Sequence, residues 1–229
     1  YLYKKGHPYA VEVVADPYDV FAPGSIKHPL RPYFRWTSWS QLKQECAKAV
    51  AAAYVTKDAL QRRYPCPNHQ AGISDVVLPE WAIVNQPRSK LKEKRTLNLI
   101  FVGTLAQLYK APDILISAVD KCVEKGLDIK LTIVGDGQYR KELEAQAARL
   151  IDKDRVCFLG QLPSGDAVRT ELDRADLFIL PSHQEGLPRA MVEAMARGLP
   201  CIGSTVGGIP ELLSSEDMVL PNDAIGLAS

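Results

Sequence analysis

Short apolar runs alternate with helical patterns after residue 95, and this alternation constrains the fold more than any other feature of the chain. Residues 98–103, NLIFVG, form a nearly continuous apolar run, which is typical of a parallel strand buried on both faces. The next segment carries apolar residues at helical spacing from Ile114 to Val123, with Pro112 in its first turn and Gly126 past its end. The same unit recurs at 129–151, 155–175, 177–197 and 200–213. Such repeats predict a doubly wound parallel sheet of the Rossmann-like α/β class, which binds ligands at the carboxyl ends of its strands.

The first 92 residues are less regular. Residues 9–15 suggest a buried strand, a helix is expected over 39–53, and another strand is expected to start at 52–55. The segment 65–93 is rich in proline and charge, so we expect a loop, a short strand near 76–78 and a linker. The chain therefore divides into a partial first domain over 1–92 and a second domain over 93–229. We expect residues 96–221 to form one compact unit, and both chain ends look cut.

The composition excludes several classes of protein. A chain of 229 residues that is 46% hydrophobic can bury a sizeable core. The net charge of +1 indicates no nucleic-acid partner. Five scattered cysteines without metal-type spacing suggest reduced thiols and a cytoplasmic protein without a metal site. No apolar run approaches the ~20 residues that a membrane-spanning helix needs.

One stretch differs from the rest in composition. Between residues 27 and 44 the chain is basic and aromatic, and includes Lys27, His28, Arg31, Arg35, Trp36, Trp39 and Lys43. It is either a solvated loop that leads into a helix, or a surface that faces a substrate or the inner face of a membrane, since this mixture suits a lipid headgroup layer. Both interpretations stay open on the sequence.

The stretch 181–211 carries the strongest indication of chemistry. An apolar strand at 177–180 leads through a loop into a helix with Pro188 in its first turn, and this helix stops at Gly198. The unpaired N–H groups near 187–190 and the helix dipole favour an anion such as a phosphate. Glu185 and Glu193 add two acceptors for the hydroxyls of a sugar or a ribose.

The motifs EGLPRAMVEAMA at 185–196 and VGGIPE at 206–211 resemble the donor-binding signature of the family-4 (group 1) retaining glycosyltransferases. The resemblance covers 96–221 and implies the glycosyltransferase-B fold of two Rossmann-like domains. It makes 93–229 the donor-binding domain and 1–92 part of the acceptor-side domain. It also implies a hexosyltransferase that moves a sugar from a nucleoside diphosphate to a saccharide or lipid-linked acceptor, in cell-surface polysaccharide or glycolipid synthesis, with no further cofactor.

The same resemblance assigns roles to single residues. It places Glu185 on hydroxyls of the transferred sugar and Lys110 on the donor diphosphate, as the catalytic pair, and Glu193 on the ribose. Where the family usually has a phosphate-binding arginine, this chain has Thr104. Each of these residues also has a simpler interpretation. Glu185 could be no more than a carboxylate that stabilises a helix N-terminus, Glu193 could pair with Arg189 and Arg197, and Lys110 could be a solvated lysine.

The remaining predicted donor contacts rest more on the resemblance than on residue chemistry. Gly135 and Gly137 are expected in the cleft wall, the backbone of residues 157–160 near the nucleobase, and Gly207 and Gly208 in a turn close to the ligand. His183 is either a structural group or a neighbour of the sugar. The full expected donor-binding set is Gly103, Thr104, Lys110, Gly135, Gly137, Phe158, Leu159, Gly160, His183, Glu185, Gly186, Leu187, Pro188, Arg189 and Glu193.

Two other functions compete with this enzyme as interpretations of the sequence. A nucleotide-sugar-binding module without transfer activity would retain the same motifs, and we expect this polypeptide to bind donor but transfer sugar slowly or not at all. A nicotinamide-dependent oxidoreductase is disfavoured, because no Gly-x-Gly-x-x-Gly follows the first strand.

Overall fold

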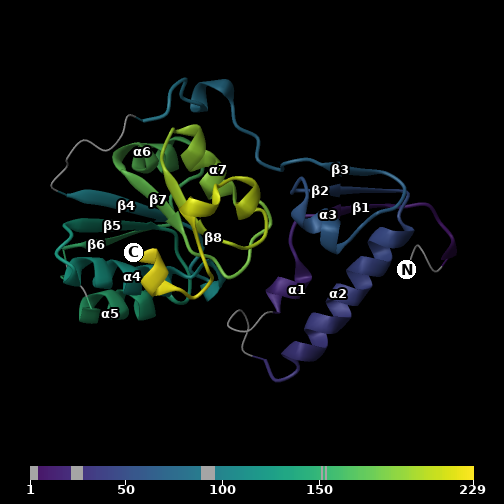
Figure 1. The fold of residues 1–229 in the computed structure, drawn as a ribbon, viewed down its shortest axis with the longest axis horizontal. Coiled ribbons are helices and arrows are strands. Elements are labelled where there is room, and N and C mark those ends of the chain that lie inside the picture. The colour runs from purple at the N-terminus through teal and green to yellow at the C-terminus, as the bar shows by residue number, and fades with distance from the viewer. Residues whose placement is uncertain (1–4, 22–27, 89–95, 151, 153) are drawn as a thin grey trace. The chain divides into compact units, whose positions relative to one another are not determined.

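The computed structural model describes residues 5–21, 28–88, 96–150, 152 and 154–229, and these form two compact units (Figure 1). The first unit comprises Tyr1–Val77, Gln184–Pro188 and Val206–Leu212. The second comprises Leu78–His183, Arg189–Thr205 and Leu213–Ser229. The domain boundary expected after residue 92 lies outside the described residues, and residues 78–88 already belong to the second unit.

The second unit is built on a six-stranded sheet in which every neighbouring pair is parallel. Its strand order is β6-β5-β4-β7-β8-β9, which, counted from the first strand of the unit, is the doubly wound order 3-2-1-4-5-6. The strands are β4 (Leu97–Val102), β5 (Ile129–Val134), β6 (Val156–Gly160), β7 (Leu177–Leu180), β8 (Cys201–Ser204) and β9 (Met218–Val219). The predicted fold class is therefore confirmed, and the chain reverses its winding direction between β4 and β7.

Helices cover both faces of this sheet, with α6 and α7 on one side and α4 and α5 on the other (Figure 1). Ala111 has a left-handed backbone immediately before Pro112, and Gly126 is left-handed just past the other end, so α4 starts and stops as the sequence predicts. The elements are α4 (Pro112–Glu124), α5 (Arg140–Leu150), α6 (Asp166–Arg174), α7 (Arg189–Ala196), α8 (Ala224–Leu227), and the 3₁₀ turns η2 (Glu80–Ala82), η3 (Leu108–Lys110), η4 (Ile209–Glu211) and η5 (Ser215–Asp217). The helix expected over 209–213 is only the short turn η4.

The first unit contains a three-stranded parallel sheet in the order β1-β2-β3. Its elements are β1 (Ala10–Val13), α1 (Pro17–Val20), α2 (Arg31–Lys48), β2 (Ala51–Tyr54), α3 (Ala59–Arg63) and β3 (Gln70–Gly72). Val13, Tyr54, Leu60 and Tyr64 are buried in its core, and Leu187 packs against the same cluster.

Two predictions for this unit are wrong. The helix expected over 39–53 begins at Arg31 and ends at Lys48, because residues 51–53 pair with β1 on one side and residues 52–53 with β3 on the other. Alanine is a good helix former, but here the ladder overrides that preference. The strand expected near 76–78 is absent, since Val77 is 90% exposed, and the third strand is formed earlier, at Gln70–Gly72.

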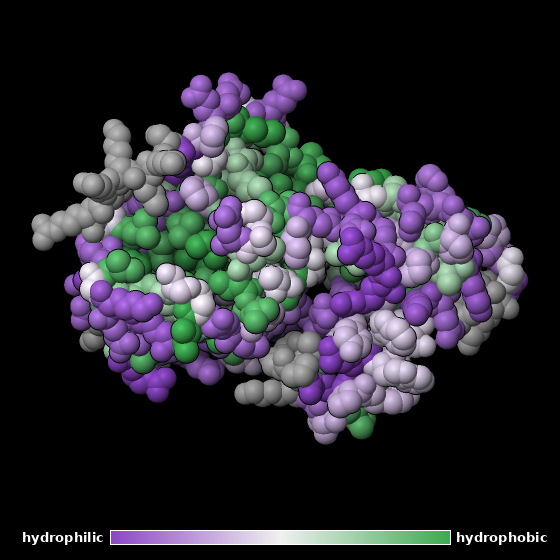
Figure 2. Space-filling view, in the orientation of Figure 1, coloured by the Kyte–Doolittle hydropathy of each residue, from purple (hydrophilic) through white to green (hydrophobic). Residues whose placement is uncertain are grey.

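The basic and aromatic stretch forms most of α2, while Lys27 lies outside the described residues. Tyr33 and Trp36 are largely exposed, at 60% and 62%. Arg35 instead donates to the Tyr18 carbonyl and stacks on the Tyr18 ring. Figure 2 shows mostly lilac to white along the visible surface of α2, so this face is neither strongly hydrophobic nor uniformly charged. None of the described helices combines the length and the apolar content that crossing a membrane requires.

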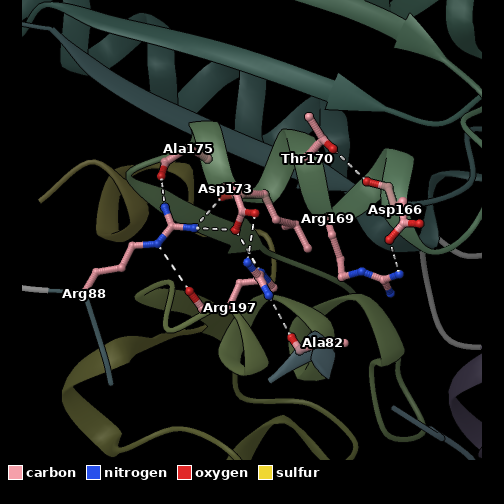
Figure 3. A network of polar contacts seen from close by, with 9 residues as sticks. Ala82, Arg88, Asp166, Arg169, Thr170, Asp173, Ala175 and Arg197 are labelled. Carbon is pink, nitrogen blue, oxygen red and sulfur yellow. Dashed lines mark hydrogen bonds and ion pairs between the residues drawn. The ribbon is translucent and has the colours of Figure 1, made fainter. Parts of the chain in front are cut away.

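Residues 80–88 are joined to the ends of α6 and α7 by a polar network (Figure 3). The Arg88 guanidinium donates to the carbonyls of Leu172, Ala175 and Arg197. Arg197 in turn binds both carboxylate oxygens of Asp173, at 2.8 and 2.9 Å. Arg88 and Arg197 therefore link residues 80–88 to the ends of α6 and α7, mainly by donating hydrogen bonds to main-chain carbonyls.

Candidate functional site

A cavity of about 610 Å³ opens at the carboxyl ends of β4, β5 and β6. Its size is typical of a site for a small ligand. It lies beside the point where the strand order reverses, which is where doubly wound sheets bind their ligands. It is lined by Val102, Gly103, Thr104, Lys110, Val134, Gly135, Gln161, Leu162, Pro163, Ser164, Val168, Arg189, Ala190 and Glu193, all from the second unit.

Glycines let two loops of the cavity wall approach each other closely. Gly135 lines the cavity, and a Cβ added to it would overlap the carbonyl oxygen of Gly103. A Cβ on Gly137 would overlap the backbone of Leu105 and Ala106. Both glycines also have positive φ, at 141° and 156°. The Gly-Asp-Gly turn is therefore required for packing of backbone on backbone, and only Gly135 of the pair reaches the cavity.

Lys110 and Thr104 both line the cavity, as the resemblance implies. Lys110 ends the turn η3, and its Nζ lies 5.4 Å from the centroid of the Tyr109 ring. Thr104 Oγ1 accepts the N–H of Ala106 at 3.1 Å, so this hydroxyl stabilises its own turn and carries no charge to replace the usual arginine. The cationic side chains that line the cavity are those of Lys110 and Arg189.

The start of α7 forms the opposite wall, where Arg189, Ala190 and Glu193 line the cavity. One simple interpretation of Glu193 was a surface ion-pair ladder with Arg189 and Arg197. The Arg197 guanidinium instead binds Asp173 and the carbonyl of Ala82. Arg197 therefore has other partners than Glu193. The Glu193 carboxylate lines the cavity one helical turn from Arg189.

Residues 157–160, which the resemblance predicts near a nucleobase, do not line this cavity. Phe158 lines a separate cavity of about 130 Å³ with residues of α5. The carbonyl of Phe158 accepts from Arg140, and that of Gly160 accepts the N–H of Gly135 at 2.8 Å. Residues 161–164 and Val168 form the wall instead. Sequence reasoning missed them, although their position directly after a predicted strand could have indicated them.

The loop 184–188 belongs to the first unit, so the prediction of one compact unit over 96–221 is wrong for this loop and for 206–212. Glu185 is buried, at 8% exposed, and Leu187 packs on the core of the first unit. Gly208 donates its N–H to the carbonyl of Gly186 at 2.7 Å. A Cβ on Gly186 would overlap the carbonyl of Val14. The structure therefore brings residues 185–188 together with Gly207 and Gly208, and brings the cavity residues together in the second unit.

His183 belongs to the second unit but does not line the cavity. The main-chain N–H of His183 donates to the carbonyl of Tyr109 at 2.7 Å, and this bond connects the loop after β7 to the loop that carries Lys110. Burial lowers the pKa of His183, and the nearby Asp113 carboxylate opposes this shift in part. Its Nδ1 is buried without a hydrogen-bond partner among the described residues. Burial therefore favours the neutral form of the His183 imidazole.

Two curated proteins illustrate the sequence relatives of this chain. Protein CapJ from Staphylococcus aureus is 30% identical over 227 residues, which cover 98% of this chain and 56% of CapJ. The putative colanic acid biosynthesis glycosyltransferase WcaL from Escherichia coli is 33% identical over 151 residues, which cover 62% of this chain and 37% of WcaL. The chain thus spans about half the length of these relatives, or less.

Among solved structures, Anabaena HepE in complex with UDP and glucose matches 99% of this chain and 61% of its own, with a TM-score of 0.71 and 20% identity. This likeness confirms the expected fold. The family model described as glycosyl transferases group 1 matches residues 96–229, which is more than half of the chain. The chain therefore belongs to the group 1 glycosyl transferase family.

Proposed function

We propose that this chain carries the donor site of a retaining glycosyltransferase, which moves a sugar from a nucleoside diphosphate to a saccharide or lipid-linked acceptor. The observation that carries the proposal is the cavity at the switch point of the sheet, with two cationic side chains, the start of a helix and one carboxylate in its wall. HepE, which shares the fold, was solved with UDP and glucose, and WcaL is named for polysaccharide synthesis. These names support a uridine diphosphate sugar and a role in polysaccharide synthesis.

The diphosphate is assigned to Lys110 and Arg189, two cationic side chains in the lining of the cavity. Arg189 is the first residue of α7, so the dipole of this helix favours the same anion. A lysine neutralises a phosphate as a point charge and needs no bidentate geometry. With Thr104 in place of an arginine, Lys110, Arg189 and the start of α7 share the neutralisation of the two phosphates.

The ribose is assigned to Glu193, which follows Arg189 by one helical turn and is therefore about 5–6 Å away along the helix surface. The base would then lie toward Val168 and residues 161–164, which complete the wall. Glu185 is assigned to hydroxyls of the transferred sugar by resemblance to the family.

During transfer the bond from the anomeric carbon to the diphosphate oxygen breaks and a bond to the acceptor oxygen forms, while the acceptor proton leaves toward the diphosphate. Lys110 and the α7 N–H groups would stabilise the charge that develops on the leaving diphosphate. Because these groups are already oriented, little reorganisation is needed as the charge appears.

Substitution of Lys110 by alanine tests this assignment. A charge-assisted contact contributes about 1.5–3 kcal/mol, which is roughly a 10- to 150-fold loss of affinity. We expect that loss for a nucleoside diphosphate but not for the matching nucleoside, as measured by calorimetry. Lys141→Ala, at an exposed position on α5, is the matched control.

An equal loss for both ligands would mean that Lys110 acts on folding. A preceding thermal-shift screen with uridine, guanosine and adenosine diphosphate sugars and with nicotinamide cofactors identifies the ligand, because a ligand that binds the native state raises its apparent stability. Stabilisation by a nicotinamide cofactor alone would contradict the proposal. A transfer assay with the ligand so identified separates a transferase from a module that only binds.

A further inference from the structure

Glu211 makes an unusual set of contacts for a residue in a surface turn. Its Oε2 accepts the N–H of Lys57 at 2.6 Å, and its Oε1 accepts the N–H groups of Asp58 and Ala59 at 3.0 and 2.8 Å. The helix α3 starts at Ala59, and the side chain of its N-cap, Asp58, makes no capping hydrogen bond. Glu211 therefore satisfies N–H groups at the start of a helix about 150 residues earlier in the chain.

The turn that carries Glu211 also lies directly on the backbone of Glu185 and Gly186. Gly208 donates its N–H to the carbonyl of Gly186 at 2.7 Å. A Cβ on Gly207 would overlap the carbonyl of Glu185 and would lie 3.1 Å from its Cβ. A shift of the 206–211 turn would therefore move Glu185 as well, because no free space separates the two backbones.

We propose that Glu211 is a positioning residue for Glu185. Its carboxylate holds the 206–211 turn against the backbone of residues 57–59. This turn then holds the backbone of Glu185 and Gly186 in place. All of these residues belong to the first unit. The inference rests on the proposed function, in which the Glu185 carboxylate accepts hydroxyls of the transferred sugar.

The geometry predicts a graded series of variants. Glu211→Ala removes all three acceptor contacts. Glu211→Gln keeps one oxygen, which can serve Asp58 and Ala59, but turns an amide toward the N–H of Lys57, so an intermediate effect is expected. Glu216→Ala removes an exposed carboxylate five residues later and is the matched control.

The decisive measurement is the affinity gained from the sugar, that is, the ratio of dissociation constants for the nucleoside diphosphate and for its sugar conjugate. We expect Glu211→Ala to lower this ratio by about tenfold or more, while the dissociation constant of the nucleoside diphosphate changes by less than about twofold. Glu185→Gln should produce a similar loss. The double variant should lose little more than either single variant, because both act on one contact.

Additive losses in the double variant, or equal weakening of both ligands, would show that Glu211 only stabilises the fold and would overturn the proposal. Hydrogen exchange over residues 184–188, measured without ligand, provides a second readout. We expect faster exchange there in Glu211→Ala, and unchanged exchange would also overturn the proposal. If the wild-type chain binds no nucleoside diphosphate sugar, the proposed function fails, while the exchange result still decides whether Glu211 positions this loop.

Discussion

Arg88 offers a quantitative test of how residues 80–88 stabilise the second unit. Its guanidinium donates to the carbonyls of Leu172, Ala175 and Arg197 and lies 3.4 Å from Asp173 (Figure 3). These acceptors are at or just past the ends of α6 and α7, and the Leu172 carbonyl also accepts the N–H of Ala175. Substitution by alanine removes every one of these contacts at once.

The expected loss follows from the contacts and their exposure. A hydrogen bond from a charged donor contributes about 1.5–3 kcal/mol when it is well made. The contact to Arg197 is long, at 3.3 Å, and the Arg88 side chain is 27% exposed, so water can replace part of the network. Counting about two effective bonds at the lower end of the range, we expect Arg88→Ala to cost about 2–4 kcal/mol.

Thermal unfolding followed by circular dichroism measures this loss. For chains of this length each kcal/mol lowers Tm by about 2–4 °C, so a decrease of about 4–16 °C is expected. The matched control is Arg174→Ala, which removes an arginine that is 71% exposed and pairs with Glu171. An exposed ion pair contributes about 0–1 kcal/mol. If the two variants unfold at the same temperature, the network in Figure 3 contributes no more than a surface pair, and the reasoning is refuted.

Two further predictions concern other parts of the chain. Gly137→Ala should destabilise the protein to urea by more than about 2 kcal/mol, because its Cβ would overlap the backbone of Leu105 and Ala106. The control Gly126→Ala, at φ 85° with open space around its Cβ position, should lose only about 1–2 kcal/mol, and equal losses would contradict the packing argument. On α2, exposed Tyr33 and Trp36 beside basic residues predict sedimentation with anionic phosphatidylglycerol vesicles that weakens with salt and with Trp36→Ala. Equal sedimentation with uncharged phosphatidylcholine vesicles, or none at all, would leave α2 as an ordinary solvated helix.

The amino-acid pattern is enough to predict the sheet of the second unit and much of its cavity. Strands buried on both faces must be nearly all apolar, and the turns around them need proline and glycine, so β4 to β8 could be placed from their composition. The resemblance to the group 1 family, which the comparisons confirm, pointed to Lys110 and Glu193, and both line the cavity. These features are visible in sequence because each depends on residues within one strand-helix unit.

Which distant segments meet is visible only in the folded protein. The helix expected over 39–53 ends at Lys48, because residues 51–53 pair with two other strands. Residues 161–164 form a wall of the cavity without any distinctive chemistry of their own. Glu211 caps a helix about 150 residues away, and the loop with Glu185 packs into the first unit. Contacts of this kind depend on the packing of whole elements, whereas the local pattern of a sequence reports only how each element is buried.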